Sequence, residues 1–349
     1  MNVLLLGATG TIGRRAAAEL ARSDEVTRLV VAGRGAAETG RVARLLARPD
    51  GSVTGAAFDA RDPAAVHRHA DGCDVVASCA GPAYDVDAGA LTGAARAGVP
   101  YASLGDYDSD APDAPAGAAA LTGCGLSPGL VEVMAVLAAR ALEHVERVDV
   151  AVARSIADAR GRASALALLH AVDRDVDDGG GRTPALVYFP EPVGWVETVP
   201  ARGPRGPVAG APAAMRLGLT ERVAMDALRA SAAARLGRGE RRRRAWLRVA
   251  RAIGPAAAAV PPRGASWSAA RVDVGGRAGG HRETVSLGVV DRLSNLAALP
   301  LVHATLALGS GRVAPAGVRA AHEALDLDEL VAALGGRGVR IARLEPQPV

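Results

Sequence analysis

The sequence predicts an α/β protein that begins with a doubly wound parallel sheet. In the N-terminal part of the chain, short apolar runs alternate with helical segments, which is the order of strands and crossover helices in such sheets. A glycine-rich turn separates the first apolar run from the first helix. The length of 349 residues leaves room for a second domain, since a domain takes about 150 residues.

Each N-terminal element follows from its local pattern. Residues 3–6 (Val-Leu-Leu-Leu) form a continuous apolar run, as expected for a strand buried on both faces. Further strands are expected at residues 28–32, 53–59, 74–79 and 99–103, with a sixth ending near 123–125. Helices are expected at residues 12–22, 63–70 and 86–97.

The pattern changes after Pro128. A helix is expected at 131–142, and a strand at 147–154 because apolar residues alternate there with a period of two. Antiparallel strands are expected at 271–274 and 283–289, and later elements at 293–308 (helix), 327–335 (helix) and 339–344 (strand). We expect domains at residues 1–125, 126–312 and 313–349.

Composition excludes several reaction classes. All 41 basic residues are arginine, because the sequence contains no lysine. Schiff-base chemistry on lysine, an anchor for pyridoxal phosphate and a Walker A loop are therefore excluded. The net charge of +4 is too small to indicate nucleic-acid binding. His67 and His69 have no Cys or His set nearby, so no metal site is expected.

The sequence shows no targeting or disulfide pattern. No uncharged apolar run reaches about 18 residues, so no transmembrane helix is expected. The N-terminus lacks the basic segment of a signal peptide, and three cysteines do not make a disulfide framework. We expect a cytoplasmic protein without a membrane contact.

The strongest motif is the segment Gly7-Ala-Thr-Gly-Thr-Ile-Gly13, which lies between the first strand and the first helix. Glycines at this spacing allow a tight turn, close approach of a pyrophosphate and close packing of helix on strand. The N-terminus of the helix would then face the phosphates. The residues expected at a bound dinucleotide here are Gly7, Thr9, Gly10, Thr11, Ile12 and Gly13.

The end of the second strand indicates the nucleotide. A site for NAD places a carboxylate about 20 residues after the glycine motif, but Gly33 and Arg34 stand there. An arginine suits a 2′-phosphate, which favours NADP; the alternative is that Arg34 stacks on adenine or faces solvent. After the later strands, the residues expected along the cofactor are Asp59 and Ala60 near the adenine, and Cys79, Ala80 and Gly81 near the nicotinamide.

Together, these motifs resemble the saccharopine dehydrogenase-like family of NAD(P) oxidoreductases. The resemblance rests on the glycine motif, Ala32-Gly-Arg34, Phe58–Asp62, Asp74–Pro82, Ala97–Tyr101, Gly123–Gly129 and the tail from Gly317 to Ile341. It implies a Rossmann domain, an inserted mixed α/β domain for substrate binding and homodimer formation, and a final helix that returns to the first domain. The family often has an acidic residue where Ser103 stands here, and Asp or Asn where Ser127 stands, so an amino-acid-binding role at these positions is not expected. The opening Gly-Ala-Thr-Gly also resembles short-chain dehydrogenases, whose catalytic Tyr-x-x-x-Lys is excluded here by the absence of lysine.

Reduction of a C=N or C=C bond needs a proton as well as a hydride. Tyr84 is the candidate general acid, because it follows the Gly81-Pro82 turn, and Asp106 is the second catalytic candidate. A substrate that is already an iminium ion would need no donor.

The expected function is an NADPH-dependent reductase acting on an imine or iminium of a small metabolite, in specialised metabolism. Two alternatives stay open: a trans-acting enoyl reductase on a carrier- or CoA-bound substrate, and a non-catalytic NADP-binding sensor. The arginine run at 241–244 is either a solvated face or a docking surface for an acyl carrier protein or a CoA phosphate.

Overall fold

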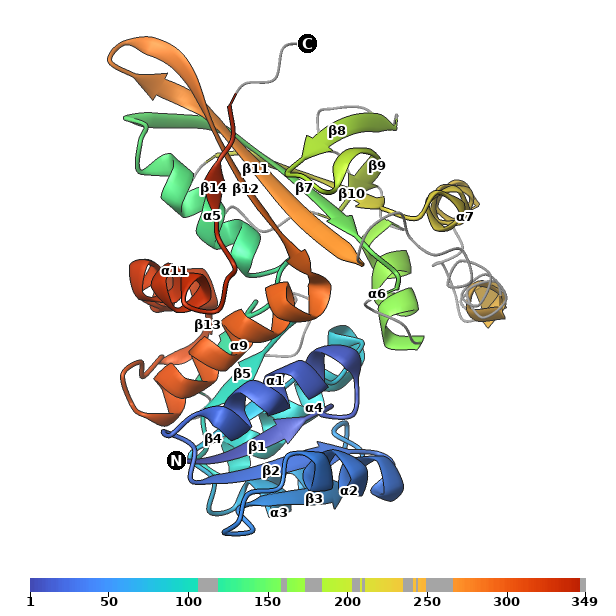
Figure 1. The fold of residues 1–349 in the computed structure, drawn as a ribbon, viewed down its shortest axis with the longest axis vertical. Coiled ribbons are helices and arrows are strands. Elements are labelled where there is room, and N and C mark those ends of the chain that lie inside the picture. Colours follow the sequence, from blue (N-terminus) through green and yellow to red (C-terminus); the bar gives the residue numbers. More distant parts are fainter. Residues whose placement is uncertain are drawn as a thin grey trace. The chain divides into compact units, whose positions relative to one another are not determined.

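The computed structural model describes residues 1–105, 119–157, 162–172, 184–202, 208, 211–234, 241–242, 244–248 and 266–345. The chain divides into two compact units (Figure 1). The first comprises Met1–Leu130 and Ser294–Leu334, and the second comprises Val131–Leu293 and Gly335–Val349. Each unit is built around its own sheet.

The first unit is a parallel sheet of seven strands in the order β13-β6-β5-β4-β1-β2-β3. The strands are β1 (Asn2–Leu6), β2 (Arg28–Gly33), β3 (Val53–Ala57), β4 (Val75–Ser78), β5 (Tyr101–Ser103), β6 (Ala119–Thr122) and β13 (Gly317–Ala320). The helices are α1 (Thr11–Arg22), α2 (Ala36–Leu45), α3 (Pro63–Ala70), α4 (Ala83–Arg96), α9 (Leu293–Gly309), α10 (Ala321–Ala324) and α11 (Leu327–Gly335).

Helices cover both faces of this sheet, which confirms the predicted doubly wound fold. Val3 and Leu5 of β1 pack in one core cluster with residues of α1, α2 and α9. Leu4 and Leu6 pack in the opposite cluster with residues of α3 and α4. Alternate residues of β1 thus serve two cores, which explains why the strand is apolar without interruption.

The second unit is a mixed sheet of seven strands in the order β14-β12-β11-β7-β10-β9-β8. Its strands are β7 (His144–Arg154), β8 (Ala185–Phe189), β9 (Gly194–Ala201), β10 (Ala213–Leu219), β11 (Trp267–Ala278), β12 (His281–Arg292) and β14 (Ala342–Arg343), and its helices are α5 (Leu130–Ala139), α6 (Arg162–Val172) and α7 (Arg222–Ala233). Strand β7 pairs in parallel with β10 and antiparallel with β11.

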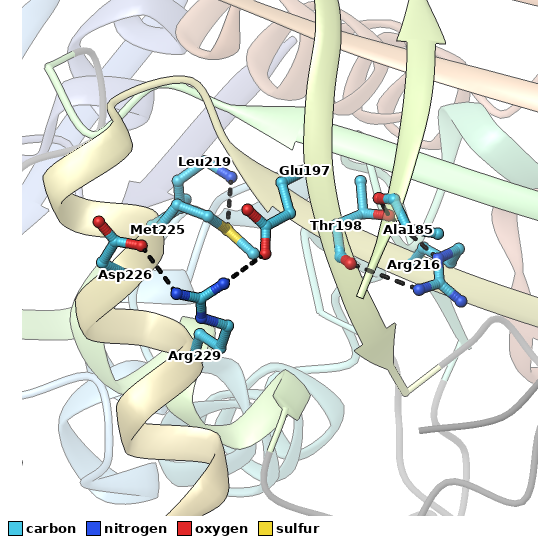
Figure 2. A network of polar contacts seen from close by, with 8 residues as sticks. All are labelled: Ala185, Glu197, Thr198, Arg216, Leu219, Met225, Asp226 and Arg229. Carbon is cyan, nitrogen blue, oxygen red and sulfur yellow. Dashed lines mark hydrogen bonds and ion pairs between the residues drawn. The ribbon is translucent and has the colours of Figure 1, made fainter. Parts of the chain in front are cut away.

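Polar contacts join α7 and two strands of the second unit at one edge (Figure 2). Arg229 of α7 forms an ion pair with Glu197 of β9 at 2.8 Å and a second with Asp226 at 3.2 Å. Arg216 of β10 donates from Nε to the Thr198 hydroxyl of β9 at 3.0 Å. The ion pair between Arg229 and Glu197 joins α7 to β9, and the Arg216 contact joins β10 to β9.

Two features differ from the sequence-based expectation. The helix at 36–45 was not expected. Only Thr39, Val42 and Ala43 are buried in it, so its sequence carries only a weak apolar pattern. The expected division at 126 and 313 also differs from the observed one. Helix α9 belongs to the first unit because its apolar residues, among them Leu301 and Ala304, lie in that unit's core, whereas residues after 334 join the second sheet.

Arg48 stabilises the end of helix α1. Its guanidinium donates to the backbone oxygens of Ala21 (Nε, 2.9 Å) and Val26 (Nη1, 2.5 Å), and also to those of Leu20 and Ser23. These carbonyls lie at the negative end of the helix dipole and in the loop that follows, so a fixed cation is favourable there.

We therefore expect Arg48→Ala to lower the free energy of unfolding by about 2–3 kcal/mol, since several partly buried carbonyls lose a charged donor. Arg41→Ala, an exposed position on α2, is the control and should change stability by less than about 0.5 kcal/mol. Chemical denaturation of both variants measures the difference. Equal stability of the two variants would contradict this role of Arg48.

Candidate dinucleotide-binding site

The turn between β1 and α1 is shaped by two of its three glycines. Gly7 has φ 73°, a conformation that favours glycine, and a Cβ there would lie 2.6 Å from the Ala80 nitrogen. A Cβ at Gly13 would collide with the Gly7 oxygen. The packing of the chain itself therefore requires glycine at both positions.

Gly10 is different, because the chain leaves room there. It is exposed, has φ −74°, and a Cβ would meet nothing closer than the Gly7 oxygen at 3.5 Å. It is also the N-cap of α1, where no side chain caps the helix and no acidic residue occupies the first turn. The uncapped amides and the positive end of the helix dipole can receive a phosphate, and the absence of a side chain lets it approach. The predicted residues Thr9, Thr11 and Ile12 belong to the same turn.

The end of β2 lies beside this turn. A Cβ at Gly33 would lie 3.2 Å from the Thr9 side chain, so the two loops are neighbours. Arg34 follows and is exposed. Within the described part of the chain, its guanidinium has no hydrogen bond or ion pair. A fixed cation at the end of β2 is what a 2′-phosphate requires.

Asp59 lies after β3 and is already paired. Arg61 holds its carboxylate through Nη2 at 2.6 Å, and this pairing, with a small contribution from Arg34, lowers the pKa of Asp59 to about 2. Asp59 is therefore a carboxylate at every pH of interest. Its predicted contact with adenine, together with that of Ala60, stays a prediction.

The turn after β4 packs directly on the glycine turn. The Cys79 nitrogen donates to the Leu6 oxygen at 2.9 Å, and Ala80 lies against Gly7. Burial raises the pKa of the Cys79 thiol, so the residue is a neutral thiol and not a nucleophile. Cys79, Ala80 and the exposed Gly81 thus present small, uncharged groups beside the predicted phosphate site.

Of the two catalytic candidates, Tyr84 and Asp106, the structure describes only Tyr84. Tyr84 lies in the first turn of α4, beside this turn, and its side chain is 43% exposed. Asp106 lies outside the described residues. Tyr101 is fully buried and points its hydroxyl at Asp87, so it does not face a substrate.

Sequence reasoning missed Asp87, a buried carboxylate of α4. It accepts hydrogen bonds from the hydroxyls of Tyr101 and Ser103, and burial raises its pKa to about 6. One signal could have found it: Asp87 stands on the apolar face that Val86, Ala90 and Leu91 define. A buried carboxylate on such a face needs hydrogen-bond donors, and these are the hydroxyls of Tyr101 and Ser103 on β5, the strand that follows α4.

The described residues contain neither a membrane-spanning helix nor a cluster of metal-ligating side chains. None of the described helices is long and apolar enough to cross a membrane. Within the same residues, no three His, Cys, Asp or Glu side chains gather in a way that could hold a metal ion.

Comparison with known families finds one match, in the N-terminal part of the first unit. Residues 3–111 match the model of the saccharopine dehydrogenase NADP-binding domain. A search of curated proteins gave no match. The resemblance stated above is confirmed for this domain, which is an NADP-binding domain of the type that NAD(P)-dependent oxidoreductases carry.

Among solved structures, the chain is similar over most of its length to DAP dehydrogenase of C. glutamicum in complex with DAP, with 17% identity, 95% of this chain and 98% of that chain covered, and a TM-score of 0.51. An engineered D-amino acid dehydrogenase bound to NADP+ has 16% identity, the same coverage and a TM-score of 0.49. Triphenylmethane reductase of Citrobacter sp. has 21% identity and a TM-score of 0.26 over 30% of this chain. The chain spans 37% of the length of that reductase. The similarity to DAP dehydrogenase concerns the fold alone.

Gly10→Val should abolish nucleotide binding with the fold retained, because a Cβ at this exposed position meets no close contact in the protein but would occupy the predicted place of the pyrophosphate. Gly13→Val is the matched comparison and should destabilise the domain, since its Cβ collides with the Gly7 oxygen. Calorimetric titration with NADP+ and thermal melting separate the two effects. Undiminished affinity in folded Gly10→Val would show that the turn is structural only.

NADPH should bind at least about tenfold more tightly than NADH, since one charge-assisted contact to the 2′-phosphate contributes roughly 1.5–3 kcal/mol. Arg34→Ala should remove most of this difference. Arg28→Ala, at the opposite end of the same strand, should leave it unchanged. Equal affinities for the two nucleotides in the unmodified protein would exclude the assigned role of Arg34.

Proposed function

We propose that the protein is an NADPH-dependent reductase that transfers hydride to a C=N bond of a small metabolite. The observation that carries this proposal is the uncapped N-terminus of α1 behind Gly10, next to the unpaired guanidinium of Arg34. Both belong to the part of the chain that matches the saccharopine dehydrogenase NADP-binding domain. The resemblance to saccharopine-type enzymes supports C=N as the bond reduced.

In this proposal, bound NADPH supplies the hydride. Gly10 and the first turn of α1 hold the pyrophosphate, and Arg34 holds the 2′-phosphate. The small residues of the turn Cys79–Gly81 let the nicotinamide half lie close to the ends of β1 and β4. Tyr84, exposed on the helix that follows, can deliver a proton to the nitrogen of the substrate as the hydride arrives. An iminium substrate needs only orientation and charge.

A carrier- or CoA-bound enoyl substrate is the second candidate, and one surface feature favours it. The described residues 241–242 and 244–248 are helical, and their arginines are exposed: Arg241, Arg242, Arg244 and Arg248. A basic helix of this kind suits an acidic carrier protein or the phosphates of CoA. A homodimer, a cytoplasmic location and a place in specialised metabolism belong to the proposal as well.

The experiment is an assay of NADPH oxidation at the nicotinamide absorbance band with two panels: imines formed from amines and carbonyl compounds, and enoyl thioesters. Turnover of imines alone supports the proposed function, and turnover of thioesters alone supports the second candidate. Tight NADPH binding without turnover in either panel would contradict both reductase functions and favour a sensor.

If Tyr84 is the proton donor, Tyr84→Phe should lower kcat by about a hundredfold or more, with almost unchanged affinity for NADPH. Tyr188→Phe is the matched control, because the Tyr188 hydroxyl donates to Glu191 within the same hairpin. Steady-state kinetics on the substrate found above measures both variants. An unchanged kcat in Tyr84→Phe would exclude the tyrosine as the acid and favour iminium reduction, with Asp106 as the next residue to replace.

A further inference from the structure

The ends of β2 and β3 place a cation and a carboxylate at equivalent positions. The Phe58 nitrogen donates to the Gly33 oxygen at 2.9 Å, which continues the ladder between the two strands. Arg34 follows Gly33 directly, and Asp59 follows Phe58 directly. The two charged residues therefore leave neighbouring strands at the same edge of the sheet, and Arg34 is near enough to contribute to the lowered pKa of Asp59.

The Asp59 carboxylate is nevertheless paired with Arg61 and not with Arg34. Arg61 Nε donates to both carboxylate oxygens at 3.1 Å, and Nη2 donates to Oδ2 at 2.6 Å. The Arg61 backbone nitrogen donates to Oδ1 at 3.0 Å, which closes a short turn. Among the described residues, no hydrogen bond or ion pair joins Arg34 to Asp59. One arginine thus occupies both oxygens of the carboxylate.

The backbone of Arg61 is held from two sides. Asp62, the next residue, is the N-cap of α3, and its carboxylate accepts a hydrogen bond from the Ala64 nitrogen at 2.9 Å. On the other side, a Cβ at Gly89 of α4 would collide with the Arg61 oxygen, so this helix packs directly on the residue. Arg61 Nη1 also lies 3.5 Å from Asp85 Oδ2 on α4. A forked arginine contact that starts from a fixed backbone keeps its geometry better than an isolated surface ion pair.

An unpaired carboxylate at Asp59 would act against a nucleotide that carries a 2′-phosphate. It would repel the phosphate, and it would offer Arg34 a partner of opposite charge at the neighbouring strand end. With Arg61 on Asp59, the guanidinium of Arg34 has no hydrogen bond or ion pair in the part of the chain that the structure describes. The pairing of Asp59 therefore bears on the phosphate that Arg34 receives.

The donors of Arg61 are directed at carboxylates of the protein. Nε and Nη2 contact Asp59, and Nη1 faces Asp85. A guanidinium between two carboxylates attracts a third anion less than one without such neighbours. The geometry thus gives Arg61 and Arg34 different tasks: the first neutralises a carboxylate of the chain, and the second is left for a phosphate.

We propose that Arg61 is a positioning residue for cofactor selection: by binding the carboxylate of Asp59, it leaves Arg34 free for the 2′-phosphate of NADPH and keeps that phosphate from being repelled. The inference rests on the proposed function, in which Arg34 holds the 2′-phosphate. Arg61 acts through Asp59, so its effect requires the carboxylate. NADH lacks the 2′-phosphate, and the effect therefore falls on the ratio of the affinities for the two nucleotides.

The test is a double-mutant cycle at positions 59 and 61 that follows the binding of NADPH and NADH. Dissociation constants of the full-length protein are measured by calorimetry at low ionic strength, where exposed charges are least screened. Arg61→Ala leaves the Asp59 carboxylate unpaired and should lower the preference for NADPH over NADH about fivefold, the size expected for one exposed ion pair. A loss common to both nucleotides, such as a weaker contact with adenine, cancels in the ratio.

Asp59→Asn removes the charge and keeps a side chain of the same shape. In this background, Arg61→Ala should leave the preference for NADPH unchanged, because no carboxylate remains to be neutralised. A loss that persists in the Asp59→Asn background would overturn the inference, since Arg61 would then contact the phosphate itself. An intact preference in the single variant Arg61→Ala would overturn it as well. Both side chains are partly exposed, so the variants should fold; Arg61→Gln gives the same comparison if Arg61→Ala does not.

Arg68→Ala is the matched control. Arg68 is an exposed arginine of α3 without an ion pair to any described residue, so its replacement removes the same charge from the same unit. This variant should keep the preference of the unmodified protein, and an equal loss in it would assign the effect to net charge and overturn the inference.

Failure of this inference can be told from failure of the proposed function. If the unmodified protein prefers NADPH and Arg61→Ala keeps that preference, only the role of Arg61 is wrong and the proposed function stands. If the unmodified protein binds neither nucleotide, or binds both equally, the proposed contact of Arg34 fails and the role of Arg61 fails with it.

Discussion

The contact between the turn after β1 and the turn after β4 determines the rest of the predicted site. Strands β1 and β4 are neighbours in the sheet, and the Cys79 nitrogen continues their ladder to the Leu6 oxygen. The two chains can leave the sheet this close together only because Gly7 has no side chain, since a Cβ would lie 2.6 Å from the Ala80 nitrogen. The helix that follows Gly7 and the turn that contains Ala80 are thus held side by side. One steric constraint therefore locates both predicted ends of the pyrophosphate–nicotinamide site.

The local sequence pattern was sufficient to predict most strands of the first unit, but not the side-chain contacts between segments that are distant in the sequence. Strand β1 could be predicted because burial on both faces leaves only apolar residues in it, whereas α2 has three buried residues and gave no clear period. The glycine spacing predicted a phosphate-binding turn after β1, and counting along the chain placed Arg34 directly after β2, where the structure has it. Asp87 could not be assigned in this way, because its partners Tyr101 and Ser103 are 14 and 16 residues away and meet it only in the folded sheet.

The second half of the chain shows the same limit. Antiparallel strands were expected at 271–274 and 283–289, and the structure extends them to β11 and β12. Helix α9 was expected as an element but assigned to another domain, because an apolar segment does not reveal which sheet it covers. Its place in the core of the first unit depends on residues nearly the whole chain length away, such as Val3 and Leu5.

Two carboxylates of the first unit, Asp59 and Asp87, have pKa values shifted in opposite directions by their surroundings. Asp59 is held by Arg61, so its pKa falls to about 2 and its charge is permanent. Arg61 also lies 3.5 Å from Asp85, which leaves Arg34 as the cation without an ion pair among the described residues around the ends of β2 and β3. Asp87 has only neutral donors, and its pKa rises to about 6. The predicted adenine end therefore carries fixed charges.

The predicted nicotinamide end carries a charge that responds to pH. No lysine exists in the chain, and arginine does not exchange protons near neutral pH. Burial keeps Cys79 and Tyr101 neutral as well. The other ionisable side chains of the turn after β4 and the first two turns of α4 are Tyr84, Asp85 and Asp87, of which Asp85 lies 3.5 Å from Arg61 and Asp87 is buried. Tyr84 is 43% exposed, whereas Asp87 is 5% exposed and its oxygens accept hydrogen bonds from Tyr101 and Ser103. Tyr84 is therefore the residue of this pair whose replacement tests the proposed proton transfer, because Asp87 is too enclosed to contact a substrate.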